Sequence, residues 1–444
     1  MSASIWDPNG NIINGDLLDA VINQLPVSVL NFAGVDPTGL SDSSTGINLA
    51  LSSGAMYVTA KGTFLLTSSL LIPDGVEFDC RDAKFLAGAN NLTMITSAGT
   101  PSSYYSQILG GVWDGNGYTN VVAMDLSNMR IRAGVFSPRW KNVDTGVICR
   151  NGMFGAVIDN PGAERVVNPV VVLANASTLA IRNPSFDNSV GFGGTGAGIG
   201  VDIRAGTGDN IGVRVAGGYI QGFSSGIKDA GIKTIISDVY LETNTYDIES
   251  SGARASHYKG IQLYGPSGTT GFRLRNSDAV IIDDPTMASG ARTGMFDADG
   301  TNTNCVARMA GSNASLNTPL GTVTGIVLTD YTAPITIADG SGAGLVLTQN
   351  NQAYRSTHGL RLTVDADITY PATASGSIAQ ITLPVAAKSG AIISGVCGFT
   401  DYGQAVFIRG SGSSINFYNG AGAALTNANL SGKRLSFSIS YLLM

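Results

Sequence analysis

The chain has 444 residues, of which 13% are charged and 58 are glycine. Globular proteins average ~25% charged residues and about 7% glycine, so this composition favours an all-β fold with many turns. The net charge is −6 and no run of Lys or Arg occurs, which argues against a nucleic-acid partner. No stretch approaches the ~20 apolar residues of a membrane span, so we expect no membrane insertion.

Cysteines and histidines are few and scattered along the chain. The 4 cysteines lie far apart without Cys-x-x-Cys spacing, and only 2 histidines accompany them. We therefore expect no metal site, no disulfide framework and no cofactor. Spacing pairs neither His257 nor His358 with a serine or an aspartate, so both are expected to be surface residues.

Two helices are predicted near the start of the chain. Residues 16–25 place apolar side chains at helical spacing between Gly15 and Pro26. A helix this short is unstable alone, so residues 1–30 either fold back on the chain as a cap or plug into a larger assembly as an anchor. The second helix is expected over residues 42–54, with Asp42 as its N-cap.

Strand-like segments repeat from about residue 108 to residue 250. One series is aromatic and one is aliphatic, and both recur every 21 to 33 residues apart from one double interval of 50: Trp113, Phe136, Phe186, Tyr219 and Tyr240; Val147, Val172, Val201, Ile227 and Ile248. Self-similarity of this kind indicates a solenoid. Its physical form is a right-handed parallel β-helix with coils ~4.8 Å apart. Asparagines suited to its corners are Asn128, Asn142, Asn151, Asn160, Asn183, Asn188, Asn244 and Asn276.

The C-terminal part of the sequence has a different pattern. Residues 289–317 are rich in Gly, Ser, Thr and Asn and predict an irregular coil or linker. Residues 321–444 show short strands separated by glycine and proline, a pattern typical of an antiparallel β-sandwich. The expected division is therefore residues 1–30, a β-helix with a capping helix over residues 31–310, and a sandwich over residues 321–444.

Three stretches carry a family resemblance. Residues 31–80 contain Asn-Phe-Ala-Gly-Val-Asp, a helix, Gly-Thr-Phe and Ile-Pro-Asp-Gly-Val in that order. Residues 111–117 read Gly-Val-Trp-Asp-Gly-Asn-Gly, and residues 236–244 read Ile-Ser-Asp-Val-Tyr-Leu-Glu-Thr-Asn. This order resembles the pectate-lyase-like β-helix proteins, especially the tailspikes and tail fibres of bacteriophages. Residues 37–39 and 59–62 depart from the family pattern, which has Asp-Gly and Pro-x-Gly there.

Carboxylates on a solvent-facing groove are the residues that cleavage of a polysaccharide requires. Retaining hydrolysis places two carboxyl groups about 5–5.5 Å apart and inverting hydrolysis about 6.5–9.5 Å, distances that suit adjacent and skipped coils respectively. The candidates are Asp187 and Glu242, which lie beside the aromatic series, and Asp202 and Asp229, which we expect to align on adjacent coils. The alternative is that these carboxylates are corner residues that bond their own backbone.

Aromatic rings next to polar groups suit sugar binding. Trp113 and Trp140 are about one coil apart and are candidates for stacking on sugar faces, with neighbouring Asp114 or Arg139 supplying hydrogen bonds. Tyr240 is a further candidate on the outer face of the coils. The alternative is an aromatic stack inside the coil.

The resemblance implies a phage tailspike or tail-fibre protein that attaches a virion to the surface polysaccharide of its host, capsule or O-antigen. It implies a homotrimer, held to the tail or baseplate by residues 1–30, that works outside the cell and uses the C-terminal sandwich for trimerisation or receptor binding. Three hypotheses stay open: a depolymerising tailspike, a fibre that only binds, and a secreted bacterial β-helix enzyme or adhesin.

Overall fold

The computed structural model describes residues 25–97, 105–127, 129, 133–205, 210–265, 269–287, 294–309, 321–329, 332–358, 361–383 and 386–442. These residues form two compact units. The first reaches Cys305 and includes a later segment that ends at Ile326, and the main part of the second begins at Val327. The anchor helix predicted over residues 16–25 lies, apart from Leu25, outside the described residues.

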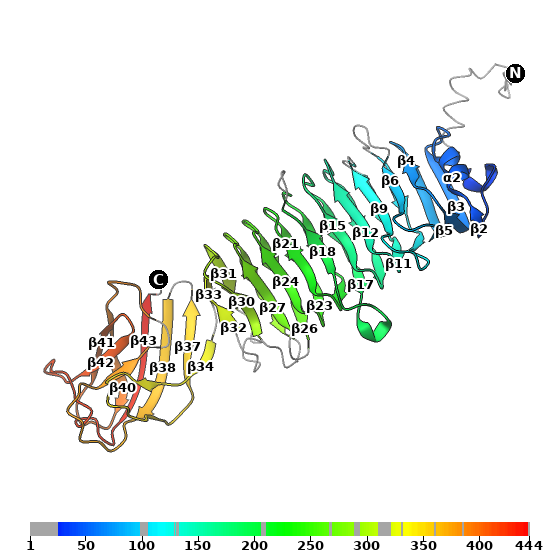
Figure 1. Ribbon diagram of the computed structural model, residues 1–444. Helices are drawn as coiled ribbons and strands as arrows, with labels where there is room; N and C mark the ends of the chain where they lie inside the picture. Colours follow the sequence, from blue (N-terminus) through cyan, green and yellow to red (C-terminus); the bar gives the residue numbers. More distant parts are fainter. Residues whose placement is uncertain are drawn as a thin grey trace, which may run out of the picture. The chain divides into compact units, whose positions relative to one another are not determined.

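The first unit is a right-handed parallel β-helix, as predicted, and Figure 1 shows its strands stacked coil upon coil. Each full coil contributes three short strands, so the unit has three faces. The first face contains β7 (Gln107–Leu109), β10 (Gly134–Phe136), β13 (Val157–Asp159), β16 (Ala180–Arg182), β19 (Arg214–Ala216), β22 (Ile235–Ser237), β25 (His257–Lys259) and β28 (Ile281–Asp283). The second face contains β8 (Val112–Asp114), β11 (Arg139–Lys141), β14 (Gly162–Glu164), β17 (Ser185–Asp187), β20 (Tyr219–Gln221), β23 (Tyr240–Glu242), β26 (Gln262–Tyr264) and β29 (Thr286–Met287).

The third face is a sheet of 11 parallel strands. It contains β4 (Leu70–Ile72), β6 (Thr93–Ser97), β9 (Val122–Ser127), β12 (Thr145–Arg150), β15 (Asn168–Val172), β18 (Ile199–Ile203), β21 (Ser225–Asp229), β24 (Tyr246–Ser251), β27 (Thr270–Arg275), β30 (Gly294–Ala298) and β32 (Gly321–Val323). Two further strands, β31 (Cys305–Arg308) and β33 (Ile326–Thr329), lie where the two units divide.

The interior is built from the middle residues of these short strands. Side chains alternate across a strand, so in a strand of three residues the middle one points inward and its two neighbours point outward. The predicted aliphatic series is confirmed for four of its five members, since Val147, Val201, Ile227 and Ile248 follow one another in register through Val170. Val172 stands two residues further along β15 and pairs with Ile203.

The aromatic series mixes positions that the sequence could not separate. Trp113 and Phe186 are middle residues of the second face and are fully buried. Tyr219 and Tyr240 are first residues of their strands and point outward, while Phe136 belongs to the first face. One residue of shift therefore decides between core and surface.

Asparagine makes many of the corners, as expected. Five of the predicted residues have the left-handed backbone that asparagine tolerates, with φ between 48 and 51°: Asn142, Asn151, Asn160, Asn183 and Asn276. Asn188 and Asn244 are instead fully buried and hold turns by side-chain hydrogen bonds. Asn128 lies outside the described residues.

The N-terminal end of the β-helix is closed by a helix. The elements there are β1 (Val27–Ser28), η1 (Val29–Asn31), β2 (Thr38–Asp42), α2 (Ser44–Leu51), β3 (Tyr57–Leu66) and β5 (Glu77–Ala87). Ile47 and Leu51 bury the apolar side of α2, which packs on β3 and β4. Ser43, not Asp42, is the N-cap, and the Asp42 carboxylate accepts a hydrogen bond of 3.1 Å from the Ser44 amide. None of the helices among the described residues is long and apolar enough to span a membrane.

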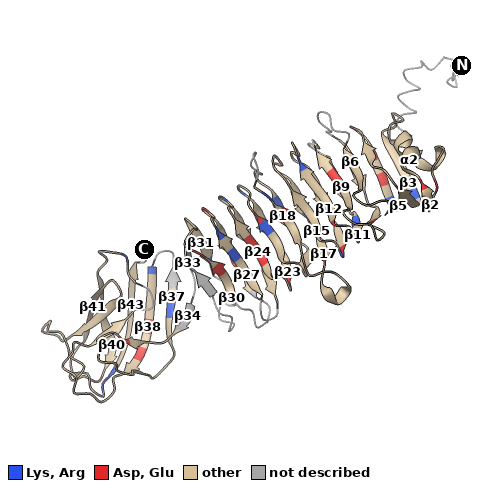
Figure 2. Cartoon of the chain, in the orientation of Figure 1, with Lys and Arg blue, Asp and Glu red and all other residues tan. Residues whose placement is uncertain are grey.

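Charged side chains on the outside of the third face neutralise one another. Outward residues of successive strands alternate in sign and stand in register: Asp202, Lys228, Glu249, Arg273 and Asp297. Figure 2 shows acidic and basic positions side by side on these strands. We call this row the charge ladder.

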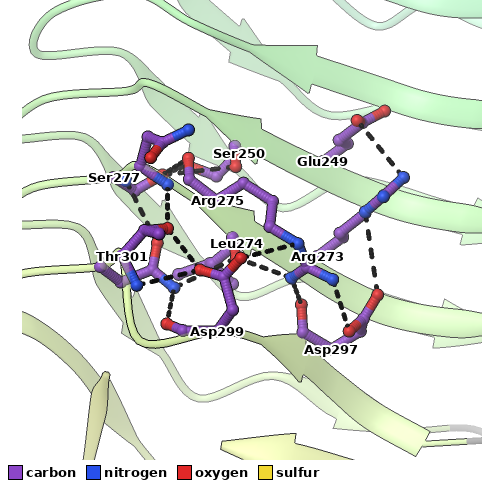
Figure 3. Close-up of polar contacts among 11 residues, drawn as sticks. Glu249, Ser250, Arg273, Leu274, Arg275, Ser277, Asp297, Asp299 and Thr301 are labelled. Carbon is purple, nitrogen blue, oxygen red and sulfur yellow. Dashed lines mark hydrogen bonds and ion pairs between the residues drawn. The ribbon is translucent and has the colours of Figure 1, made fainter. Parts of the chain in front are cut away.

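At the C-terminal end of the charge ladder, Arg275 and Asp299 extend the row of ion pairs (Figure 3). Arg273 lies 3.7 Å from Glu249 and 3.8 Å from Asp297. Arg275 donates to the Asp297 carboxylate at 2.7 Å and lies 3.2 Å from Asp299. Both arginines are thus held between carboxylates and present no free charge to a ligand.

The second unit is an antiparallel sheet of 10 strands folded around its own apolar core, as the sequence predicts. The strands are β34 (Thr332–Ile335), β35 (Ala338–Asp339), β36 (Thr348–Gln349), β37 (Ala353–His358), β38 (Arg361–Thr369), β39 (Gln380–Thr382), β40 (Ile393–Thr400), β41 (Phe407–Ser411), β42 (Ser414–Tyr418) and β43 (Arg434–Leu442). Strand β40 pairs with both β41 and β43 and so joins the two layers. Ile368, Phe417 and Leu435 are fully buried between them.

Candidate functional site

A groove of about 550 Å³ runs along the outside of the second face. It crosses the strands from β8 to β20, and a short 3₁₀ helix, η2 (Val190–Phe192), borders it. The polar and aromatic residues that line it are Arg139, Trp140, Lys141, Glu164, Ser185, Asp187, Phe192 and Tyr219, of which Trp140 is buried.

The first side chain of interest is Arg139, which lies across the floor of this groove. Arg139 is exposed and stands in register with Gly162 on the next coil. A Cβ atom at Gly162 would approach Arg139 Nη1 to 2.0 Å, so the guanidinium occupies the space that a side chain there would fill. Arg139 has no ion pair with any described residue. The Arg139 guanidinium, which has no ion pair with a described residue, thus fills the space that the missing side chain of Gly162 leaves.

The carboxylates of the groove stand next to each other on the strands. Glu164 lies 3.3 Å from Lys141 and 2.9 Å from Arg165. Asp187 is in register with Glu164 and accepts hydrogen bonds on Oδ1 from the amide and hydroxyl of Ser189, at 2.9 and 2.7 Å. In-register residues on adjacent coils are ~4.8 Å apart, so the two carboxyl groups form a close pair.

A loop after β17 makes one wall of the groove, and Figure 1 shows it projecting from the stack of strands. Phe192 and Val190 are 72% and 71% exposed on it. The loop is closed at its base by the buried Asn188, whose Nδ2 donates to Thr195 Oγ1 at 3.1 Å and to the Ala197 carbonyl at 2.7 Å. The wall therefore has a fixed base and an apolar tip.

Two predicted catalytic residues share one outward column. Asp187 is in register with Gln221, which is in register with Glu242. The two carboxylates are thus two coils apart, or ~9.6 Å at the backbone. Tyr240 stands in the neighbouring outward column, in register with Tyr219. Glu242 and Tyr240 do not line the groove itself.

The other predicted catalytic pair does not exist, so that prediction is wrong. Asp202 is in register with Lys228, whereas Asp229 is in register with Ile203. This shift of one residue points Asp202 outward, where it pairs with Arg204 at 2.6 Å, and points Asp229 into the core.

Asp229 is a structural carboxylate inside the coil. It accepts hydrogen bonds of 2.8 Å from the Gly231 amide, the Thr234 hydroxyl and the Tyr258 hydroxyl. Burial, followed by the charge of Asp229, raises the pKa of Tyr258. Tyr258 therefore keeps its proton and remains a donor to Asp229.

The indole rings of the predicted sugar surface also lie inside. Trp113 and Trp140 are in register and are 0 and 1% exposed. Trp113 stacks on Phe85 with ring centroids 4.3 Å apart, and Trp140 lies 6.2 Å from Phe186. Neither ring can offer a face to a sugar, so the prediction for these two residues is wrong and the alternative of an internal stack holds.

Asp114 is a buried corner residue. Its carboxylate accepts hydrogen bonds from the Asn116 amide and from Asn142 Nδ2, both at 3.0 Å, and pairs with Lys84 at 3.0 Å. Burial alone would raise the pKa of Asp114, but these hydrogen bonds and the Lys84 charge lower it overall. Its contacts are those of a turn and leave no room for a sugar ligand.

Sequence spacing did not predict the side-chain contact that His257 makes. His257 Nε2 lies 2.6 Å from Asp283 Oδ2 on the next coil of the first face. Among the described residues no group of three or more His, Cys, Asp or Glu side chains is placed to hold a metal ion. The four cysteines are free and buried.

The groove residues that the sequence did not indicate are Lys141, Glu164, Phe192 and Tyr219, whereas Arg139 was predicted as a hydrogen-bonding partner of sugars. Arg139, Lys141 and Glu164 flank buried middle residues, Trp140 and Ala163, so the outward positions follow once the inward register is known. The signal that could have found them is thus the second-face register, which the sequence did not reveal.

No protein-family model matches the chain, and no curated protein matches it. The Dettilon tailspike protein is similar at 11% identity and a TM-score of 0.49, over 97% of this chain and 96% of that one. PfbA, a surface adhesin of Streptococcus pneumoniae, is similar at 13% identity and a TM-score of 0.44, over 69% of this chain and 78% of that one. A Geobacillus virus E2 protein is similar at 12% identity and a TM-score of 0.43, over 94% of this chain and 82% of that one.

Proposed function

We propose that the chain is a bacteriophage tailspike or tail-fibre protein that attaches the virion to bacterial surface polysaccharide, capsule or O-antigen, through the second-face groove. The observation that supports this most directly is the groove itself, where exposed rings and carboxylates stand side by side. Tyr219 and Phe192 offer ring faces to the C–H faces of sugars. Asp187, whose Oδ2 has no partner among the described residues, and Arg139 supply hydrogen bonds to hydroxyl groups.

A binding assay against immobilised bacterial surface polysaccharides tests this function. Phe192→Ala and Tyr219→Ala are expected to weaken binding about fivefold each, because each removes an aromatic contact worth ~1 kcal/mol. Tyr57→Ala is the matched control, since Tyr57 is 40% exposed on β3, away from the groove. Equal binding by all three variants and the wild type would rule out this groove as the glycan site.

A depolymerising activity is the second candidate, favoured by the outward column of Glu164, Asp187 and Glu242. Glu164 and Asp187 stand one coil apart, which suits a retaining pair, and Asp187 and Glu242 stand two coils apart, near the upper limit for an inverting pair. Chain-length analysis of the bound polysaccharide after incubation decides between cleavage and binding alone.

Amide variants identify the carboxylates if cleavage occurs. Asp187→Asn is expected to abolish turnover and keep binding, with Glu164→Gln doing the same for a retaining pair and Glu242→Gln for an inverting pair. Asp82→Asn, an exposed position on β5, serves as the control. Intact chains after incubation with the wild-type protein would leave binding as the whole function.

We also propose that the chain works as a homotrimer. Support comes from large apolar side chains exposed on the second unit, among them Val346, Ile392 and Phe399, at 82, 83 and 52%. Light scattering should return about three times the chain mass of 45.7 kDa. A mass of one chain for the folded protein would contradict the trimer.

The last part of this proposal concerns residues 1–30 as the attachment to the tail or baseplate. Deleting residues 1–24 keeps β1 paired with β3, so the fold and the oligomer should survive. Particles assembled with this variant are expected to lack the protein. Aggregation of the variant would instead favour a capping role for the segment.

A further inference from the structure

Arginines of the β-helix fall into two groups by their contacts. On the third face, Arg150, Arg204, Arg273 and Arg275 are all within 4 Å of a carboxylate. Among the described residues of the first unit, three guanidinium groups have no ion pair and no hydrogen bond, those of Arg139, Arg182 and Arg214. Arg139 belongs to the second-face groove, but Arg182 and Arg214 lie on the first face.

The first face has a groove of its own, of about 540 Å³. Arg182 and Arg214 line it together with the hydroxyl side chains of Thr178 and Ser237. The other lining residues are glycine, alanine, valine and isoleucine, so its lining contains two cations, no carboxylate and no aromatic ring.

The two arginines face the same space from adjacent coils. Strands β16 and β19 pair in register, with Arg214 beside Ala180 and Arg182 beside Ala216. This diagonal places their Cα atoms about 8 Å apart, from ~4.8 Å between coils and ~3.3 Å per residue along the strand. An alanine next to each arginine leaves the floor between them open.

The nearest carboxylate does not neutralise this groove. Asp159 is the in-register neighbour of Arg182 on the preceding coil, yet no ion pair joins them. The two arginines stand diagonally on adjacent coils, about 8 Å apart at Cα, and neither has an ion pair among the described residues. The fold gains nothing from them, in a chain whose net charge is −6, so an external anion is the natural counter-charge.

We propose that the first-face groove is a second polysaccharide subsite, one that binds an acidic group of the glycan through Arg182 and Arg214. The group is a sugar carboxylate or a phosphodiester, both of which the guanidinium fork binds by paired hydrogen bonds. Ser237, whose hydroxyl has no hydrogen bond with a described residue, then bonds a sugar hydroxyl, while the Thr178 hydroxyl is held by the Ser177 carbonyl and the Gly155 amide. This inference rests on the proposed function for the polymer, but it adds a site and restricts the ligand to acidic glycans.

Nucleic acid is a poorer occupant of the same groove. Single-stranded nucleic acids bind to aromatic stacking platforms, and a duplex needs a row of cations along its phosphates. The lining supplies no aromatic ring and only two arginines.

The experiment measures binding of the full chain to a panel of immobilised bacterial polysaccharides, acidic and neutral. We expect the wild type to select acidic polymers, and the double variant Arg182→Gln/Arg214→Gln to bind them at least ~10-fold more weakly at unchanged melting temperature. The Arg182→Lys/Arg214→Lys variant should recover part of the loss, because it keeps the charge but not the fork. Arg361→Gln, an exposed arginine of the second unit, controls for the loss of charge alone.

Chemical changes to the bound polymer identify the anion. Carboxyl reduction of the polymer should weaken binding as much as the double Gln variant does if the group is a carboxylate, whereas removal of phosphodiesters should do so if it is a phosphate. Binding that survives both treatments overturns the proposal, as does wild-type affinity of the double Gln variant or wild-type selection of neutral polymers. These results leave the proposed function standing, whereas a wild type that binds no polysaccharide overturns both. Binding of a single-stranded DNA probe that is lost in the double variant would reassign the groove to nucleic acid.

Discussion

The third face and the two groove-bearing faces share one coil and one core, yet their outer surfaces differ in how completely their charges are paired. On the third face every charge of the ladder lies within 4 Å of an opposite charge, which comes from the next coil for Glu249 and Arg273 and from the same coil for Asp202. On the other faces Arg139, Arg182 and Arg214 meet none among the described residues. Arginine occurs on all three faces. A candidate binding site is therefore recognised by arginines without an ion pair, and not by the presence of arginine.

The difference also shows what each surface contributes to stability. Ion pairs on an exposed ladder are each worth ~0–1 kcal/mol and hold neighbouring coils in register. Unpaired arginines over glycine or alanine contribute nothing of this kind, and the role that we propose for them is contact with a ligand. Variants that leave one surface intact while altering the other should therefore separate stability from binding.

The largest effect is expected inside the coil, at Asp229. Asp229→Ala should lower the free energy of unfolding by about 3 kcal/mol or more, because the hydroxyls of Thr234 and Tyr258 lose their buried acceptor. Asp202→Ala is the matched control on the ladder and should cost only about 1 kcal/mol, since its partner Arg204 is 52% exposed and regains water. Urea unfolding measures both, and equal losses would contradict the inward and outward assignment of these two residues.

A pair of glycine variants sharpens the comparison between faces. A Cβ atom at Gly146 on β12 would meet the Pro169 carbonyl at 2.4 Å and the Trp140 ring at 2.5 Å, so Gly146→Ala should cost about 2 kcal/mol by overpacking. At Gly162 the same atom meets the flexible end of Arg139, so Gly162→Ala should change stability by at most about 0.5 kcal/mol.

For ligand binding, the same two glycine variants are expected to show effects in the opposite order. Gly162→Ala pushes Arg139 off the groove floor and should weaken polysaccharide binding several-fold, whereas folded Gly146→Ala should bind as the wild type does. Thermal unfolding and a binding titration on the two proteins give all four values. Loss of stability without loss of binding in Gly162→Ala would show that Arg139 is not a ligand contact.

The smallest effect is a pH dependence at the edge of the ladder. A hydrogen bond from Thr301, with further help from the Arg275 charge, lowers the pKa of Asp299. A carboxyl whose pKa is lowered by folding stabilises the protein above its unfolded pKa of ~4, and that contribution disappears as pH falls through the folded value. The stability difference between wild type and Asp299→Asn should therefore shrink on acidification from about pH 6 to about pH 3. A difference that grows over this range would contradict the sign.

Interior periodicity was the part of the fold that the sequence could predict. Aliphatic residues such as Val201, Ile227 and Ile248 recur because every coil has to fill the same core position. Corner asparagines such as Asn160 and Asn183 were also predictable, since the left-handed backbone restricts the residue type there.

The site was less predictable because outward and inward positions differ by one residue. Trp113 and Trp140 were expected outside and lie inside, whereas Asp229 was aligned with Asp202 and stands on the opposite side of the sheet. Whether a charge is paired depends on the neighbouring coil, which is separated by a loop of variable length. The packing of Arg139 over Gly162 is such a contact between coils, and no local sequence pattern predicts it.

The loop closed by Asn188 has a consequence for how the wall of the second-face groove can vary. Its two ends are joined by the hydrogen bonds of one side chain, and the strands before and after it keep their registers, Asp187 with Gln221 and Val170 with Val201. Residues between Val190 and Gly194 can therefore be exchanged, lengthened or shortened as a cassette without rewinding the coil. Under the proposed glycan-binding function, a new ligand specificity can arise in this wall while the solenoid beneath it keeps its core.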